Sequence, residues 1–521
     1  MKKRIAIGIL TALLAIASVI EFGGNVSADQ EEKAQTAVAQ EDEWSDVREK
    51  IIVGLHWLTK PEVEKQAVEI PLISVKSNDS RNYEVTIDND DKTFKKAWQN
   101  VTLQYKSEMP FERIYLKLER ACLWTVTLPD GSVKQGGESG FIHELLELEQ
   151  SVTSFQLNLP EGAMLCDVYA FTAGKLPSWV QIWELPCENA DFLVLPTHAD
   201  DEHLWFGGVL PYYAGELGYK VQVVYMTNHF DDNVRSHELL NGLWLVGVRH
   251  YPIISQRFKD LFASKDGISA ALEVYDRQKV LAFQVEMMRR FSPKVVIAHD
   301  IHGEYGHGAH ILNAQTVLEA LPLTEDASVF PESAEKYGTC KVQKCYLHLW
   351  KERPIVMEWR NMPLARFDNV SALEMAVNGF HCHVSQLKWN FQVEDSGRLD
   401  CRKFGLAYTT VGDDTPGKND MLEHVIWPNE SKNTDDTSSG LVSDSSVKKT
   451  SVSSAGRTIA SQTSASRATV GQTSVGQTTS GQVWKMERHD DRFVRLFAFL
   501  ALAVSGVICA SVVTAVYAKR T

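Results

Sequence analysis

DFLVLPTHADDEHLWFGG, residues 191–208, joins two apolar segments through a cluster of polar residues. Phe192 to Leu195 form an apolar run with the length of a buried strand, and Pro196 ends this run. Leu204 to Leu217 is again largely apolar and is typical of a helix. Open α/β sheets hold their functional groups between such a strand and helix, beyond the carboxyl end of the strand. The stretch therefore predicts an α/β fold with a site in its polar loop.

The polar loop carries three acids and two histidines within six residues. They are His198, Asp200, Asp201, Glu202 and His203. Buried without a cation, these side chains would repel one another and lose their hydration. A divalent metal is the simplest way to hold them together.

A second strand and loop offer further ligands. Lys294 to His299 is a short apolar strand, and residues 300–310 after it read DIHGEYGHGAH. His307 and His310 are three residues apart, which places them on one face if a helix begins there. Two histidines and one carboxylate, with a position left for water, form the ligand set of a catalytic zinc site. The alternative is that both loops are solvated and bind no metal. The presence of two loops rich in ligand-type side chains, each directly after a strand, argues against this alternative.

The two loops resemble the motifs of the PIG-L/LmbE family of zinc-dependent N-acetylglucosaminyl deacetylases. The resemblance rests on HADDE at residues 198–202 and GEYGHGAH at residues 303–310, and it covers residues 191–321 with a weaker continuation to about Asp414. Ala199 stands where the family usually has Pro, and Gly308-Ala309 stand where it usually has Pro-Asp. Neither departure removes a ligand.

The resemblance implies a role for individual residues. The implied metal ligands are His198, Asp201 and His310. The implied catalytic groups are Asp200 as general base, with Tyr305 and His307 polarising the acyl carbonyl. Arg235 and Glu238 match an R-x-x-E pattern on the substrate side. Glu202 and Glu304 are candidates for orienting the ligand imidazoles, and His203, His299 and His302 are alternative ligands.

These roles predict amide hydrolysis by a metal-activated water. The metal polarises the acetyl carbonyl, and Asp200 takes the proton of the water. Zn²⁺ is the expected cofactor, although two histidines and one aspartate also suit iron, cobalt or manganese. The expected substrate is a glycan or glycoconjugate that contains N-acetylglucosamine.

Three other functions stay open on the sequence alone. A zinc amidohydrolase for another N-acyl substrate would keep the same site. A catalytically inactive glycan-binding protein is a second alternative, against which the intact set of His198, Asp200, Asp201 and His310 argues. A metal-dependent phosphoesterase is the third, and the lack of a bridging-carboxylate pattern argues against it.

Composition and the chain ends predict class and location. The 521 residues exceed one domain, and the net charge of −14 argues against a nucleic-acid partner. Residues 1–28 are typical of a signal peptide, with an uncleaved anchor as the alternative. Residues 496–518 are apolar enough to form a transmembrane helix, and Lys519-Arg520 after them favours a cytoplasmic C-terminus. We therefore expect a secreted, membrane-anchored protein with an extracellular catalytic domain.

The remaining segments complete the expected organisation. Residues 29–48 are an acidic leader, residues 49–186 an accessory β-sandwich-like domain, residues 187–427 a deacetylase domain with a parallel, Rossmann-like sheet, and residues 428–485 a disordered Ser/Thr-rich stalk. Aromatic residues of the β domain are candidates for glycan binding, with core packing as the alternative: Trp98, Tyr105, Tyr115 and Trp124. Cys340 with Cys345, and Cys382 with Cys401, are close enough in sequence to form disulfides, and reduced cysteines are the alternative.

Overall fold

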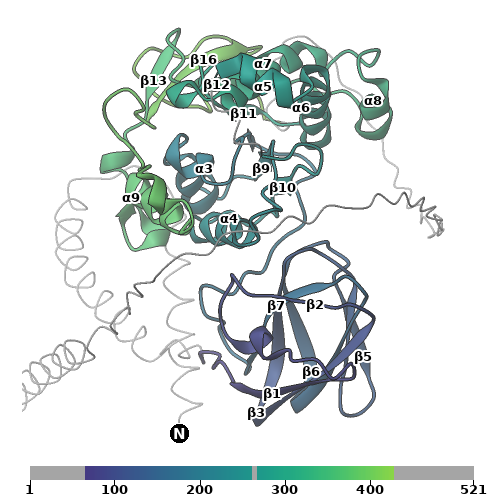
Figure 1. Cartoon of the computed structure of the whole chain (residues 1–521). Coiled ribbons are helices and arrows are strands. Elements are labelled where there is room, and N and C mark those ends of the chain that lie inside the picture. The colour runs from purple at the N-terminus through teal and green to yellow at the C-terminus, as the bar shows by residue number, and fades with distance from the viewer. Residues whose placement is uncertain (1–64, 261–266, 428–521) are drawn as a thin grey trace, which may run out of the picture. The chain divides into compact units, whose positions relative to one another are not determined.

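The N-terminal part of the described chain is a β-sheet structure (Figure 1). The computed structural model describes residues 65–260 and 267–427. Seven strands form one sheet in the order β2-β7-β3-β6-β4-β5, with β1 paired to β3, and every pair is antiparallel. The strands are β1 (Leu72–Ser77), β2 (Lys95–Lys96), β3 (Val101–Leu118), β4 (Trp124–Thr127), β5 (Val133–Gly136), β6 (His143–Leu159) and β7 (Met164–Phe171).

Side chains of this sheet alternate between its two faces. In β3, Val101, Leu103 and Tyr105 are buried, while the residues between them are partly exposed, as the period of two in a strand requires. Of the four aromatic residues considered for glycan binding, Tyr105, Tyr115 and Trp124 lie in the core, and only Trp98 is exposed. The strand-rich character predicted for this region is therefore observed. Its independence as an accessory domain stays a prediction.

The second sheet belongs to the α/β part of the chain. Its order is β10-β9-β8-β11-β12-β16-β13. The strands are β8 (Phe192–Val194), β9 (Val221–Tyr225), β10 (Ile253–Ile254), β11 (Val295–Ala298), β12 (Lys344–His348), β13 (Pro354–Val356) and β16 (Lys403–Thr409). A small separate sheet pairs β14 (Pro363–Leu364) with β15 (Val370–Ser371).

This second sheet is mixed, which corrects the predicted all-parallel sheet. The strands from β10 to β12 run parallel, but β16 pairs with both β12 and β13 in the antiparallel direction. The apolar run that forms β16 does not determine the direction of this strand, because direction depends on how the preceding connection returns to the sheet. In the described chain, that connection returns β16 along β12, with Lys344 opposite Thr409.

Helices and short turns connect the strands of the α/β part. The α-helices are α3 (Asp201–Leu204), α4 (Val234–Leu245), α5 (Gly267–Val274), α6 (Arg277–Phe291), α7 (Gly308–Leu323), α8 (Pro331–Tyr337) and α9 (Ala372–His381). A π-helix, η2 (Leu210–Glu216), follows α3. The 3₁₀ helices are η1 (Glu84–Ile87), η4 (Glu304–Gly306), η5 (Trp359–Asn361), η6 (Ala365–Phe367) and η7 (Leu387–Trp389). All described residues belong to a single compact unit.

The predicted membrane-anchored localisation is contradicted by the described helices. Within residues 65–260 and 267–427, no helix is long and apolar enough to cross a bilayer. The two longest described α-helices, α7 and α6, have 16 and 15 residues, whereas a span needs about 20. The predicted signal peptide, leader, stalk and transmembrane helix, at residues 1–28, 29–48, 428–485 and 496–518, lie outside the described residues.

The cysteines of the described chain are unpaired. All seven of them are free, so neither candidate disulfide is formed, and the alternative of reduced cysteines is confirmed for these residues. Five of the seven are buried, where they act as small apolar side chains.

Candidate metal centre

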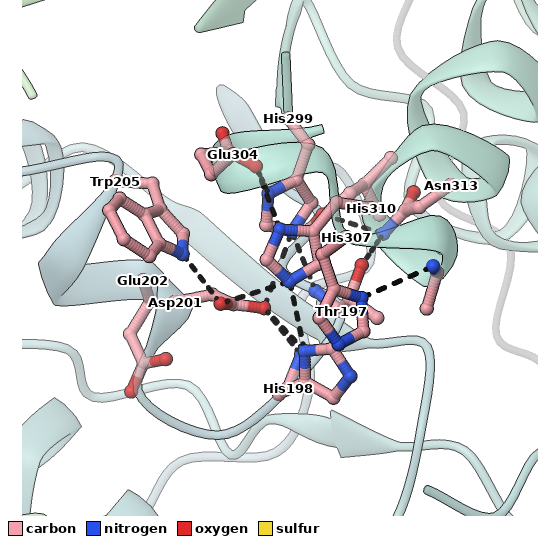
Figure 2. A network of polar contacts seen from close by, with 12 residues as sticks. Thr197, His198, Asp201, Glu202, Trp205, His299, Glu304, His307, His310 and Asn313 are labelled. Atoms are coloured by element: carbon pink, nitrogen blue, oxygen red, sulfur yellow. Dashed lines mark hydrogen bonds and ion pairs between the residues drawn. The ribbon is translucent and has the colours of Figure 1, made fainter. Parts of the chain in front are cut away.

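Two neighbouring parallel strands bring the two predicted loops together. β8 and β11 pair directly, with Val194 opposite Ile297, and all residues of both strands are buried. The loops that follow them therefore begin at the same sheet edge. Asn313 of α7 links the two loops, because its side-chain amide donates to the carbonyl of Leu195 at 3.1 Å and to Oγ1 of Thr197 at 2.9 Å (Figure 2).

The three predicted metal ligands converge. Nδ1 of His198 lies 3.0 Å from Nε2 of His310 and 3.2 Å from Oδ2 of Asp201. Nε2 of His310 lies 3.4 Å from Oδ1 of Asp201. Ligands bound to one tetrahedral zinc ion at about 2.0–2.2 Å are about 3.4 Å from one another, so these separations suit a shared ion. All three side chains are buried.

The carboxylate of Asp201 is held in its ionised form. One oxygen accepts a hydrogen bond from the indole of Trp205 at 2.7 Å, and the other accepts from the backbone N–H of His198 at 2.6 Å (Figure 2). Burial by itself raises the pKa of Asp201, but His310, His299 and His198 outweigh it and hold this pKa well below its usual value. An ionised carboxylate beside two imidazoles is a donor set that fits a divalent cation.

Glu304 orients the imidazole of His310. Its Oε2 lies 2.8 Å from Nδ1 of both His310 and His299, and its Oε1 lies 2.7 Å from Nδ1 of His348. Because Nδ1 of His310 donates to Glu304, Nε2 of the same ring is free to bind metal. Glu304 thus has the position predicted for it. His348 was not predicted, since it ends strand β12 without any motif around it.

The three alternative ligands lie in other environments. Nε2 of His299 accepts from the backbone N–H of Thr197 at 2.9 Å, so both of its nitrogens have partners. His302 is exposed. His203 lies in a separate buried cluster with Glu202 and His383. Glu202 accordingly does not contact a ligand imidazole; it accepts from the backbone N–H of Asp200 at 2.9 Å.

Asp200 is a buried carboxyl group beside the three ligands. Its backbone has φ 128° and ψ −27°, a conformation that is rare for residues other than glycine. Burial raises the pKa of Asp200, and this effect outweighs the opposing influence of Arg235, whose guanidinium lies 3.9 Å away. A carboxylate with a raised pKa is a better proton acceptor than an exposed one.

Tyr305 and His307 line the same cavity as Asp200. Nδ1 of His307 accepts from the backbone N–H of Ala309 at 3.2 Å at the start of α7, so a neutral ring carries its proton on Nε2. Burial lowers the pKa of His307 to about 2, helped by His310 and His198, and the ring is therefore neutral in the metal-free protein. The backbone of Tyr305 has a positive φ of 47°. Its ring packs against that of Phe391 in a tilted arrangement, with the ring centroids 5.4 Å apart.

A cavity of about 410 Å³ opens onto these groups. Of the eight predicted site residues, all except His310 and Glu238 line it: His198, Asp200, Asp201, Arg235, Tyr305 and His307. Further residues outside the two motifs also line it: His229, Asp260, Gln386, Lys388, Trp389 and Phe391. Glu238 is not part of this lining, because it accepts hydrogen bonds from the backbone and side chain of Ser385 at 2.7 and 2.5 Å.

Part of this chain is similar to known proteins. Residues 193–321 match the PIG-L family, described as GlcNAc-PI de-N-acetylase. A curated relative from Saccharopolyspora erythraea, 1D-myo-inositol 2-acetamido-2-deoxy-alpha-D-glucopyranoside deacetylase 2, is 28% identical over 173 residues. That match covers 29% of this chain and 63% of the relative, so the chain spans less than two thirds of the relative's length.

Two solved structures are similar at lower identity. The N,N'-diacetylchitobiose deacetylase from Pyrococcus horikoshii is 16% identical, with a TM-score of 0.29 over 39% of this chain and 72% of that chain. The 4-carboxy-2-hydroxymuconate hydratase from Pseudomonas putida is 14% identical, with a TM-score of 0.28 over 43% of this chain and 98% of that chain. The family match covers both polar loops and the helix after the second. Residues 193–321 of this chain are a PIG-L family domain.

Proposed function

We propose that this chain is a metal-dependent hydrolase that removes the N-acetyl group from an N-acetylated amino sugar. The observation that carries the proposal is the convergence of His198, Asp201 and His310 within 3.4 Å of one another, in a PIG-L domain. Asp200 stands beside them at the wall of a cavity of about 410 Å³. The curated relative is named as a deacetylase of an acetamido sugar, which supports the same reaction class here.

The donor set fits a divalent ion, with Zn²⁺ preferred for two imidazoles and one carboxylate. His198, Asp201 and His310 would hold it, and Glu304 would fix the ring of His310. When bound, such an ion supplies a Lewis acid for the acetyl carbonyl and acidifies the attacking water.

Asp200 takes the proton of the attacking water in this proposal. Its carboxylate lies 3.9 Å from the guanidinium of Arg235, and it lines the cavity. The hydrogen bond from its backbone to Glu202 holds the residue in its unusual conformation. General bases placed in this way typically contribute about 10²–10⁴-fold to a rate.

Tyr305 and His307 supply hydrogen-bond donors for the oxyanion of the tetrahedral intermediate. The proton on Nε2 of His307 and the phenol of Tyr305 are the available donors, since Nδ1 of His307 is already an acceptor. Both residues line the cavity next to His198, and the rings of His198 and His307 lie 4.7 Å apart. Donors aimed at developing negative charge are often the largest contribution to such catalysis.

The lining of the cavity supports a sugar as substrate. Trp205, Trp389 and Phe391 provide aromatic surface for the apolar face of a pyranose ring, while Arg235 and Asp260 provide groups that bind hydroxyls. The volume suits one sugar residue with its acetamido group. A small number of polar groups on an aromatic wall is the usual composition of a small-molecule site.

Acetate release by the full chain, supplied with Zn²⁺, tests the proposal. The substrates are N-acetylglucosamine, its short oligomers and a glucosaminyl-inositol carrying the same acetamide. Asp200→Asn is the test variant, and His302→Gln, which alters an exposed histidine of the same loop, is the matched control. We expect release by the wild type and the control, and none by Asp200→Asn at unchanged metal content.

Two results would contradict the proposal. A metal-loaded protein that releases acetate from none of these sugars, but hydrolyses another N-acyl compound, would be an amidohydrolase of different specificity. Hydrolysis that Asp200→Asn leaves intact would remove Asp200 from the role of base.

A further inference from the structure

A second cluster of potential metal ligands lies on the other side of Asp200. Glu202 and His203 belong to α3, and His383 follows α9. Oε1 of Glu202 lies 3.1 Å from Nε2 of His383 and 3.5 Å from Nε2 of His203. All three side chains are fully buried. Figure 2 shows the carboxylate of Glu202 pointing away from the group formed by Asp201 and His198.

The imidazoles of this cluster lack hydrogen-bond partners. Neither Nδ1 nor Nε2 of His203 has one among the described residues, and neither has Nδ1 of His383. A neutral imidazole carries one donor and one acceptor, and a buried ring normally satisfies both. The contact with Glu202 satisfies Nε2 of His383, but it leaves Nδ1 of His383 and both nitrogens of His203 without a partner among the described residues. A cation bound to Oε1 of Glu202 and to one nitrogen of each ring would give His203 a partner that the described residues do not supply.

Two glycines make room for the His203 ring. A Cβ atom on Gly242 of α4 would lie 2.8 Å from Nε2 of His203 and 3.3 Å from Nε2 of His383. A Cβ atom on Gly379 of α9 would lie 2.7 Å from Nδ1 of His203. Both helices thus present a residue without a side chain where the ring packs, so the polar ring occupies a space that an ordinary apolar side chain at either position would close.

We propose that Glu202, His203 and His383 form a second site for a divalent metal, buried and distinct from the catalytic ligands. Their donor atoms lie within 4.8 Å of one another. Two imidazoles and one carboxylate select borderline ions such as Zn²⁺ or Co²⁺ over Ca²⁺ or Mg²⁺. Because the site is enclosed, its ion is structural and does not meet substrate.

The ion in this second site acts on Asp200 through Glu202. One carboxylate oxygen of Glu202 faces His383, while the other accepts the backbone N–H of Asp200 at 2.9 Å. A metal ion that holds Oε1 of Glu202 therefore also fixes the hydrogen bond between its Oε2 and the backbone of Asp200. Asp200 needs such a restraint, because its φ of 128° is unfavourable for a residue with a side chain. Glu202 is accordingly a positioning residue.

Metal content tests this site independently of any activity. The full chain is stripped with chelator, reloaded with Zn²⁺, desalted and analysed by elemental mass spectrometry. The wild type, His383→Gln, His310→Gln and the double variant are compared. We expect the wild type to hold one equivalent more than either single variant, and two more than the double variant. Any additional metal bound elsewhere would add equally to all four proteins. The differences in zinc content between the proteins therefore report on the two sites alone.

The outcomes separate this inference from the proposed function. If His383→Gln holds as much zinc as the wild type, the second site is overturned. If His310→Gln loses nothing while His383→Gln loses one equivalent, the second site stands and the proposed catalytic metal falls. If His383→Gln fails to fold, Co²⁺ titration of His310→Gln tests whether the second site exists. Absorption bands of imidazole-bound Co²⁺ saturating at one equivalent support the second site, and their absence overturns it.

Discussion

Nδ1 of His310 donates to Oε2 of Glu304 over 2.8 Å, and this contact points the opposite nitrogen of the ring at His198 and Asp201. The same oxygen of Glu304 contacts His299, and its other oxygen contacts His348. One buried carboxylate therefore sets the orientation of three imidazoles. The geometry of the proposed metal site depends on a residue that does not bind the metal itself.

Glu304→Gln is expected to weaken Zn²⁺ binding by about 10–100-fold, because it removes the charge that orients the ring of His310. The dissociation constant, measured by competition with a chelator, tests this prediction. Glu325→Gln, at an exposed position after α7, is the control and should bind as the wild type does. Equal affinities for all three proteins would show that Glu304 does not support the ligand.

Zinc binding is expected to release a proton from His198. Burial favours the neutral ring, but Asp260 and Asp201 outweigh it and raise the pKa of His198 to about 10 in the metal-free protein. The imidazolium must lose its proton before it can bind metal, so apparent affinity should rise about tenfold per pH unit up to that pKa. Calorimetry in buffers of different ionisation enthalpy measures the release.

Asp260→Asn is the matched variant for proton release. It removes the charge of Asp260, which contributes most to raising the pKa of His198. It should make zinc affinity less dependent on pH near neutrality. Release of no proton by the wild type at pH 7 would mean that His198 is already neutral before the metal binds.

Tyr305→Phe is expected to lower kcat by about 10²-fold and to leave KM nearly unchanged, because the phenol is assigned to the transition state and not to substrate binding. Steady-state kinetics of acetate release give both constants. Tyr337→Phe, on α8 and outside the cavity lining, controls for loss of a tyrosine hydroxyl. A raised KM at constant kcat would assign Tyr305 to substrate binding.

Gly242→Ala is expected to destabilise the protein by about 1–3 kcal/mol, although alanine favours a helix by about 1 kcal/mol. The new methyl group would lie 2.8 Å from a ring nitrogen of His203 and 3.0 Å from the carbonyl oxygen of Gly379, and neither neighbour is the end of a flexible chain. Thermal unfolding measures the change. A higher Tm than that of the wild type would show that His203 can leave its present position without cost.

The convergence of His198, Asp201 and His310 could be predicted because their spacing is local. His198 and Asp201 lie three residues apart at the end of one strand, and His310 follows the neighbouring strand, so motif and topology suffice. The position of Glu238 could not be predicted in the same way. Its R-x-x-E pattern places it near Arg235 on α4, but the segment around Ser385, distant in sequence, takes up its carboxylate.

Two other residues come from segments without a motif and were not predicted. Asp260 reaches the cavity from a loop whose sequence carries no periodic pattern, and His348 reaches Glu304 from the end of a strand. The direction of β16 was missed for a related reason, because apolar content is the same for a strand running either way. Contacts between distant segments decide all of these positions.

Gln386, Lys388, Trp389 and Phe391 form one wall of the cavity, and all of them follow the PIG-L domain, which ends at residue 321. The wall of the cavity is thus built partly from residues within the matched segment and partly from a short stretch beyond it. Residues 386–391 can therefore change the shape and polarity of the cavity without any change in the polar loops at residues 198–203 and 300–310.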